Sequence, residues 1–179
     1  MMLSKLPFLA GILCASCVGQ AELPPNDPAT APVQEAPAPA APTQPAAASA
    51  EDSTTAIVCS GTDDIVIENR DLNVAGNAVT VEGSCDVTII NSQIIAQGWG
   101  LVVSGSGDIV VRNSSINGQL GSMSIQGSGD IKSESSTFVG TVSISGSGDL
   151  TAATSNFTGN RSISGTGEYE DQGGNTWSE

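Results

Sequence analysis

Six acidic residues recur at the same place in a repeated turn, where an array of carboxylates could bind a cation or act as acid and base. They are Asp64, Asp86, Asp108, Asp130, Asp149 and Glu168. Carboxylate oxygens are ligands that Ca²⁺ prefers. The structural alternative is that each carboxylate accepts hydrogen bonds from the amides of its own turn. The pattern favours this structural role and predicts no cofactor, with a Ca²⁺ ladder on Asp64, Asp86, Asp108, Asp130 and Asp149 as the alternative.

Paired carboxylates also suggest glycoside cleavage, but the other parts of such a site are missing from the sequence. The chain has no His. Its few basic residues are scattered along the repeats, and Arg112 is expected to pair with Glu134 one repeat later. No repeat carries a long insertion that could wall a water-poor cleft. The sequence therefore predicts no catalytic residues and a protein that is not an enzyme.

Trp99 and two cysteines are the remaining candidates. Trp99 lies between Gly98 and Gly100, so its ring either folds over the edge of the repeats or stays exposed to stack on a sugar or a partner. Cys59 and Cys85 are one repeat and four residues apart. A disulfide between them is predicted for an oxidising compartment, if a tight corner brings their Cα atoms within about 7 Å.

The acids end a turn that recurs at a fixed period, and this period predicts how they are positioned. The turn reads Gly, then Ser or Thr, usually Gly, then the acid. Successive opening glycines are 22, 22, 22, 19 and 19 residues apart. A fixed period near 20 residues is typical of a solenoid, in which each repeat buries its apolar side against its neighbours.

Apolar residues fall in register when the repeats are aligned on the acid. Large apolar side chains recur one, three and eight places after it and two places before the next opening Gly, and polar residues lie between them, which is a strand pattern. The columns begin with Ile65–Val87–Ile109, Ile67–Ile89–Val111, Leu72–Ile94–Ile116 and Cys59–Val81–Val103. The prediction is an all-β fold, a right-handed single-stranded parallel β-helix of about six short coils.

A corner and a cap complete the expected domain. Asn69, Asn91 and Asn113 recur five places after the acid, followed by Ser135 and Thr154. Asn tolerates left-handed backbone angles, so this ladder predicts a corner. Residues 168–179 are polar, break the period and carry Tyr169 and Trp177. They are expected to cap the last coil, and residues 54–179 are expected to form the whole β-helix domain.

The N-terminal third has a different composition. Residues 1–21 have the form of a secretion signal, with an apolar run at 6–18 that is too short to span a bilayer. Either residues 19–21 form a signal-cleavage site, or residues 15–17 form a lipobox in which Cys17 is lipidated. Residues 22–53 are rich in Ala and Pro and are expected to form a disordered tether. The mature chain is therefore expected to be secreted, periplasmic or anchored to the outer membrane.

Residues 104–109, 127–131 and 143–150 resemble the auto-transporter adhesin head (GIN) domain of bacterial secreted proteins. That resemblance covers about residues 100–168 and implies a β-solenoid with an adhesin-like surface role and no catalytic residues to carry over. Residues 64–113 look more like generic right-handed β-helices. The Gly-Ser-Gly-Asp phrase is also similar to the repeats of calcium-binding β-rolls, although the period here is not nine.

The expected function is a structural or adhesin-like role at the cell surface, without enzymatic activity. One alternative is a polysaccharide-binding module or a relative of polysaccharide-active enzymes, and a second is a fibre-forming subunit. The expected partners are a cell-envelope component or a glycan. A net charge of −14 argues against nucleic acid, membrane contact is expected only through a lipid on Cys17, and the expected oligomeric state is a monomer.

Overall fold

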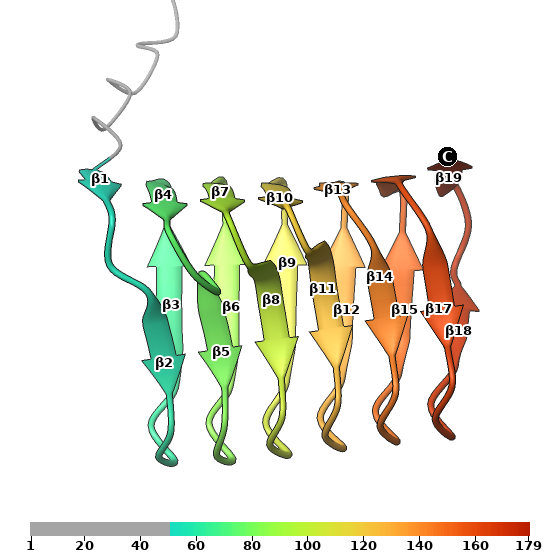
Figure 1. The fold of residues 1–179 in the computed structure, drawn as a ribbon, viewed down its shortest axis with the longest axis horizontal. Helices are drawn as coiled ribbons and strands as arrows, with labels where there is room; N and C mark the ends of the chain where they lie inside the picture. Colours follow the sequence, from blue (N-terminus) through green and yellow to red (C-terminus); the bar gives the residue numbers. More distant parts are fainter. Residues whose placement is uncertain (1–50) are drawn as a thin grey trace, which may run out of the picture. The chain divides into compact units, whose positions relative to one another are not determined.

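The chain folds as a β-solenoid of about six coils, and each coil contributes one strand to each of three parallel sheets (Figure 1). The structure, a computed structural model, describes residues 51–179. Along the chain each coil runs down one sheet, through a turn into a second, and around a corner into the third. The coils wind in a right-handed sense, as predicted (Figure 1).

Sheet A has seven strands and the other two sheets have six. Sheet A contains β1 (Glu51–Ser53), β4 (Arg70–Val74), β7 (Gln93–Ala96), β10 (Ser115–Gly118), β13 (Thr137–Val139), β16 (Asn156–Thr158) and β19 (Thr176–Ser178). Sheet B contains β2 (Ile57–Cys59), β5 (Val79–Val81), β8 (Trp99–Val103), β11 (Gly121–Ile125), β14 (Val142–Ile144) and β17 (Arg161–Ile163). Sheet C contains β3 (Ile65–Glu68), β6 (Val87–Ile90), β9 (Ile109–Arg112), β12 (Ile131–Glu134), β15 (Leu150–Ala153) and β18 (Tyr169–Asp171).

The core is built from vertical columns of inward side chains. Ile109 pairs with Val87 on one side and Ile131 on the other, which confirms the predicted register. Ile116 likewise pairs with Ile94 and Phe138. These side chains are fully or almost fully buried, and burying each one contributes about 1.5–3 kcal/mol. Because no single coil encloses its own apolar side, stacking is what stabilises the fold.

The corner between sheets C and A has left-handed backbone angles, as the Asn ladder predicted. The residues of this ladder are Asn69 (φ 52°), Asn91 (φ 49°), Asn113 (φ 49°), Ser135 (φ 50°) and Thr154 (φ 48°). Asn adopts this region more readily than Ser or Thr because its short amide bonds to the local backbone.

The domain starts earlier than the sequence-based boundary, and its last residues form strands. β1 covers residues 51–53, which the sequence assigned to the tether, and it pairs with β4. The ordered domain therefore begins before residue 54, and β1 covers the edge that β4 would otherwise expose. At the other end, residues 168–179 continue sheets C and A through β18 and β19. The signal sequence, Cys17 and the tether up to residue 50 lie outside the described residues.

Aromatic side chains close the C-terminal end of the core. Trp177 stacks on Phe157 with ring centroids 4.3 Å apart, and Tyr169 meets Trp177 edge to face at 5.4 Å. The Arg161 guanidinium lies over both rings, 5.0 Å from the Tyr169 centroid and 5.1 Å from that of Trp177. Tyr169 and Trp177 act as cap residues by extending the core columns over the last full coil.

Candidate interaction face on sheet C

The outer face of sheet C carries side chains that neither the core nor the turns use. In each strand of this sheet the first and third residues point inward, so the second and fourth point outward. The parallel register stacks the outward residues in two columns. The second-place column is Val66, Thr88, Val110, Lys132, Thr151 and Glu170, and the fourth-place column is Glu68, Ile90, Arg112, Glu134 and Ala153.

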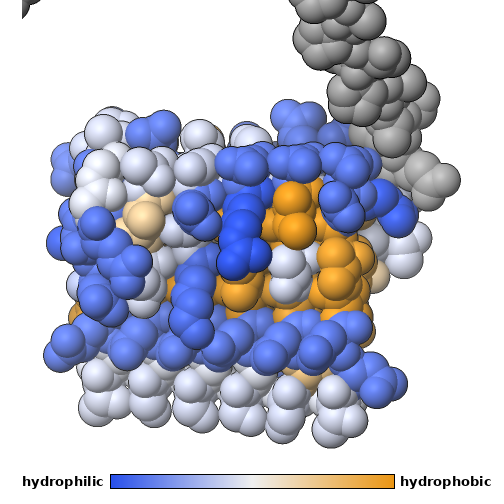
Figure 2. All heavy atoms as spheres, turned by 180° about the vertical axis from the view of Figure 1, so that it is seen from behind, coloured by the Kyte–Doolittle hydropathy of each residue, from blue (hydrophilic) through white to orange (hydrophobic). Residues whose placement is uncertain are grey.

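The N-terminal half of this face is apolar. Val66 keeps 65% of its surface exposed, while Ile90 and Val110 are half-buried. Figure 2 shows this patch on the side of the face nearer the N-terminus, bordered by hydrophilic side chains. We call Val66, Thr88, Ile90 and Val110 the apolar strip.

The C-terminal half of the face is charged and slightly hollowed. A shallow, open depression of about 600 Å³ lies over β9, β12, β15 and β18, and its lining includes Arg112, Lys132, Glu134, Asp149 and Glu170. We call it the charged depression. Because it is open to solvent, charges within it are strongly screened.

Two ion pairs cross neighbouring coils in and beside the charged depression. Arg112 Nε lies 3.4 Å from Glu134 Oε2, which is the pair predicted from the repeat. Lys132 Nζ lies 3.1 Å from Asp108 Oδ2. That hydrogen bond, together with the charges of Asp108, Asp130 and Asp86, raises the pKa of Lys132 above its ordinary value. Arg112, Lys132 and Glu134 remain half-exposed or more, so each can also contact a ligand.

The acid ladder forms one border of sheet C and serves the backbone. The Oδ1 atom of Asp86 accepts the backbone N–H of Asp108 at 2.8 Å, and Asp108 Oδ1 accepts that of Asp130 at 2.8 Å. The same bond recurs along the whole series from Asp64 to Glu168. The prediction that turn amides would satisfy these carboxylates was right in kind, but the donor lies in the next coil and not in the same turn.

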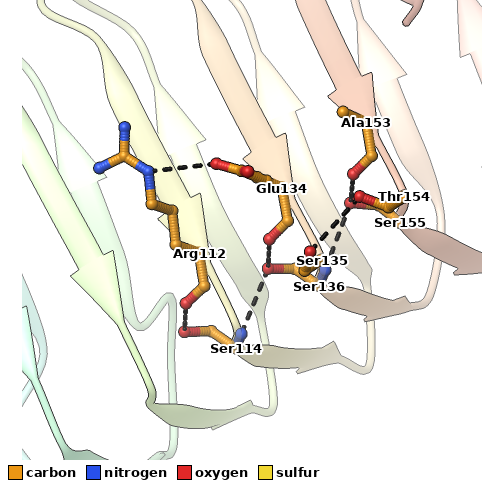
Figure 3. Close-up of polar contacts among 8 residues, drawn as sticks. All are labelled: Arg112, Ser114, Glu134, Ser135, Ser136, Ala153, Thr154 and Ser155. Carbon is orange, nitrogen blue, oxygen red and sulfur yellow. Dashed lines mark hydrogen bonds and ion pairs between the residues drawn. The ribbon is translucent and has the colours of Figure 1, made fainter. Parts of the chain in front are cut away.

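The opposite border of sheet C is a ladder of buried serines, which the sequence analysis did not identify. Ser114 Oγ accepts the N–H of Ser92 at 3.0 Å and donates to the carbonyl of Arg112 at 2.7 Å. Ser136 and Ser155 repeat this arrangement one and two coils later (Figure 3). Each hydroxyl satisfies two backbone groups at the corner, where strand pairing is interrupted. The signal was available, because a Ser follows four of the five ladder residues at the corner.

Glycine in the repeated turns is required by close approach of the coils. A Cβ on Gly105 would collide with the carbonyl of Gly83, and one on Gly107 would collide with that of Cys85. Any side chain there would push neighbouring coils apart. The turns are therefore spacers of fixed height, which keeps the acid ladder within hydrogen-bonding distance from coil to coil.

The cysteines and Trp99 lie away from the sheet C face. A disulfide joins Cys59 in β2 to Cys85 in the turn of the next coil, between β5 and β6, with Cα atoms 6.1 Å apart, and both residues are buried. Trp99 starts β8 in sheet B. Its ring lies where a Cβ on Gly121, one coil later, would be, so it folds over the solenoid surface and is half-buried. Trp99 therefore lies apart from the acid ladder, whereas the disulfide is buried beside it, because Cys85 directly precedes Asp86.

Within residues 51–179, no three His, Cys, Asp or Glu side chains are grouped so that they could hold a metal ion. Each of the five aspartates in the ladder uses Oδ1 for the backbone, which leaves Oδ2 for solvent or for a basic side chain, as in the contact of Asp108 with Lys132. The Ca²⁺ ladder therefore stays a prediction. Across the same residues, no helix is long and apolar enough to cross a membrane.

Comparison with known proteins found no matching family model, no similar curated protein and no similar solved structure.

Proposed function

We propose that the protein is a non-enzymatic β-solenoid of the cell surface or cell envelope, and that it binds a polar partner through the charged depression of sheet C. The observation that carries this proposal is that two sets of polar side chains have different contacts. The ladder residues bond to the backbone, whereas Arg112, Lys132 and Glu134 project from adjacent strands of one flat sheet and stay accessible.

Several features support a binding role over a catalytic one. The chain lacks His, and the repeated carboxylates that could act as acid and base accept backbone hydrogen bonds. The depression is open, whereas catalysis by carboxylates needs a site that excludes water. Rows of donors and acceptors on a rigid sheet suit a repetitive ligand whose polar groups recur at a regular distance.

The chemistry of the depression favours an uncharged polar ligand, such as the hydroxyl groups of a neutral glycan. Its two basic side chains are already balanced by Glu134 and Asp108, and further acids line it. An acidic glycan would also be repelled by the net charge of −14. The secretion signal and the tether expected from the sequence would display this face outside the cytoplasm.

A binding screen of the mature full-length protein against glycans and cell-envelope components tests this proposal. We expect binding that Lys132→Ala weakens and that Asn117→Ala, an exposed substitution on sheet A, leaves unchanged. Binding that both substitutions weaken equally would place the site elsewhere. Release of reducing sugars from any bound polysaccharide would contradict the non-enzymatic role.

A further inference from the structure

The apolar strip lies beside the charged depression but has a different character. Most outward side chains on the solenoid are polar, yet three of the four residues in the strip are aliphatic and β-branched, and Val66 is 65% exposed. A strip of this kind on a regular sheet is suited to pack against another sheet face.

The apolar strip, together with Glu68 and Arg112 on its two sides, is complementary to itself. Read across β3, β6 and β9, the second-place column is Val66, Thr88, Val110, which has the same chemistry from either end. The fourth-place column is Glu68, Ile90, Arg112, which has opposite charges on either side of an apolar centre. We propose that the strip binds a second copy of this chain, related by a two-fold axis that lies between the two faces and runs parallel to β6.

This axis keeps the strand direction and reverses the order of the coils. It places Ile90 on the partner's Ile90, and Val66 on the partner's Val110. It also places Glu68 opposite the partner's Arg112, and this contact occurs twice. The other two-fold axis, parallel to the solenoid, would oppose Val66 to the partner's Glu68 and is not complementary. Isologous contacts of the first kind close as a dimer and do not grow into fibres.

Arg112 is able to serve both neighbours. Its ion pair with Glu134 uses Nε, and Figure 3 shows the two terminal guanidinium nitrogens pointing away from Glu134. The Arg112 side chain is 51% exposed. A guanidinium carries donors on several nitrogens in a fixed plane, so the terminal pair can bind a second carboxylate without losing the first.

The overlap is small, so the dimer is weak. Three strands of four residues, with coils about 4.8 Å apart and residues about 3.3 Å apart, cover about 200 Å² on each copy. Stable interfaces cover about 800 Å² on each partner. Self-association is therefore expected at high micromolar to millimolar concentration, or between copies held on one surface. Strands β12, β15 and β18, with most of the charged depression, lie outside the overlap.

Analytical ultracentrifugation of the mature protein alone, from about 10 µM to 1 mM, tests the dimer without any ligand, so its failure is independent of the proposed function. We expect a monomer–dimer equilibrium over this concentration range. Ile90→Lys opposes like charges on the axis and should weaken association at least about tenfold. The matched control is Ile95→Lys, on an exposed Ile of sheet A, which should leave it unchanged.

A charge exchange tests the register itself. Glu68→Arg alone and Arg112→Glu alone should each weaken association, and the double variant should restore it towards the wild-type value. Thermal melting confirms that each variant is folded. A wild-type monomer at 1 mM, equal effects of Ile90→Lys and Ile95→Lys, or no restoration in the folded double variant would each overturn the proposal.

Discussion

Two substitutions of Asp108 distinguish a structural role of the acid ladder from a role in binding Ca²⁺. Asp108 Oδ1 accepts the N–H of Asp130 at 2.8 Å, and Oδ2 accepts a hydrogen bond from Lys132 at 3.1 Å. Asp108→Ala removes both acceptors. Asp108→Asn keeps an oxygen that can accept from Asp130 but removes the charge. The two substitutions therefore differ in the feature on which the structural interpretation depends.

The magnitudes follow from these contacts. Leaving the partly buried Asp130 amide unpaired costs about 1–3 kcal/mol. Losing the exposed ion pair to Lys132 costs about 0.2–1 kcal/mol. Relief of repulsion from the neighbouring carboxylates returns up to about 1 kcal/mol per pair, and less in salt. We expect Asp108→Ala to lower the free energy of unfolding by about 1–3 kcal/mol and Asp108→Asn to change it by less than about 1 kcal/mol.

Thermal and urea unfolding measure the difference, and hydrogen exchange of the Asp130 amide locates it. For a domain of about 130 residues, 1 kcal/mol corresponds to about 3–5 °C in Tm. The Asp130 amide should exchange faster in Asp108→Ala and remain protected in Asp108→Asn. Equal destabilisation by both substitutions, or a fall in the Tm of the wild type when EDTA is added, would contradict the backbone role of the acid ladder and favour a Ca²⁺ ladder.

Three further perturbations test the packing and the charge. Gly107→Ala should destabilise the protein by about 2 kcal/mol or more in urea unfolding because its Cβ would meet the Cys85 carbonyl. Gly76→Ala, with open space around it, should have little effect. Equal effects of the two substitutions would contradict the spacer role of the turns. Ser133→Ala should raise stability by about 1 kcal/mol because this buried hydroxyl has no hydrogen-bond partner within the described residues, and a lower Tm would show that the hydroxyl is satisfied. The pKa of Lys132 is raised from 10.5. Its contribution to stability should therefore be constant from pH 7 to about pH 10 and disappear as pH rises through the folded pKa. A difference in the free energy of unfolding between wild type and Lys132→Met that already falls below pH 9 would contradict this.

The sequence predicted the vertical register because the spacing of the turns and the apolar columns agreed on it. The spacing of the turn glycines set the period, and columns such as Val87–Ile109–Ile131 followed from it. The left-handed corner was predictable at Asn91 because Asn is suited to that backbone region. Local chemistry and global repeat pointed to the same fold, which is the condition under which such predictions succeed.

The hydrogen bonds that decide the role of the ladders were not predictable from one repeat. The donor to Asp108 belongs to Asp130, 22 residues away, and is in reach only because the glycine turns set the coil height. The serine ladder was not predicted because Ser is common in the chain and is not a typical core residue. The start of the domain was misplaced because β1 pairs with β4 through its backbone, which leaves no pattern in the side chains.

The candidate face on sheet C was not predicted from the sequence for a related reason. Val66, Ile90 and Lys132 occupy outward positions that vary from coil to coil, whereas sequence reasoning gave weight to what repeats. Carboxylates that recur in every coil are suited to a role in every coil, which is to hold the backbone. In this solenoid the residues proposed to bind are those that depart from the repeat.

The most direct test of this account is a measurement of scalar coupling across the hydrogen bond between the backbone nitrogen of Asp130 and the side-chain carboxylate carbon of Asp108. We expect a detectable coupling in the metal-free protein, unchanged by added Ca²⁺, with the same coupling between Asp108 and Asp86. Absence of these couplings, together with shifts of the carboxylate resonances when Ca²⁺ is added, would contradict the claim that the acids serve the backbone.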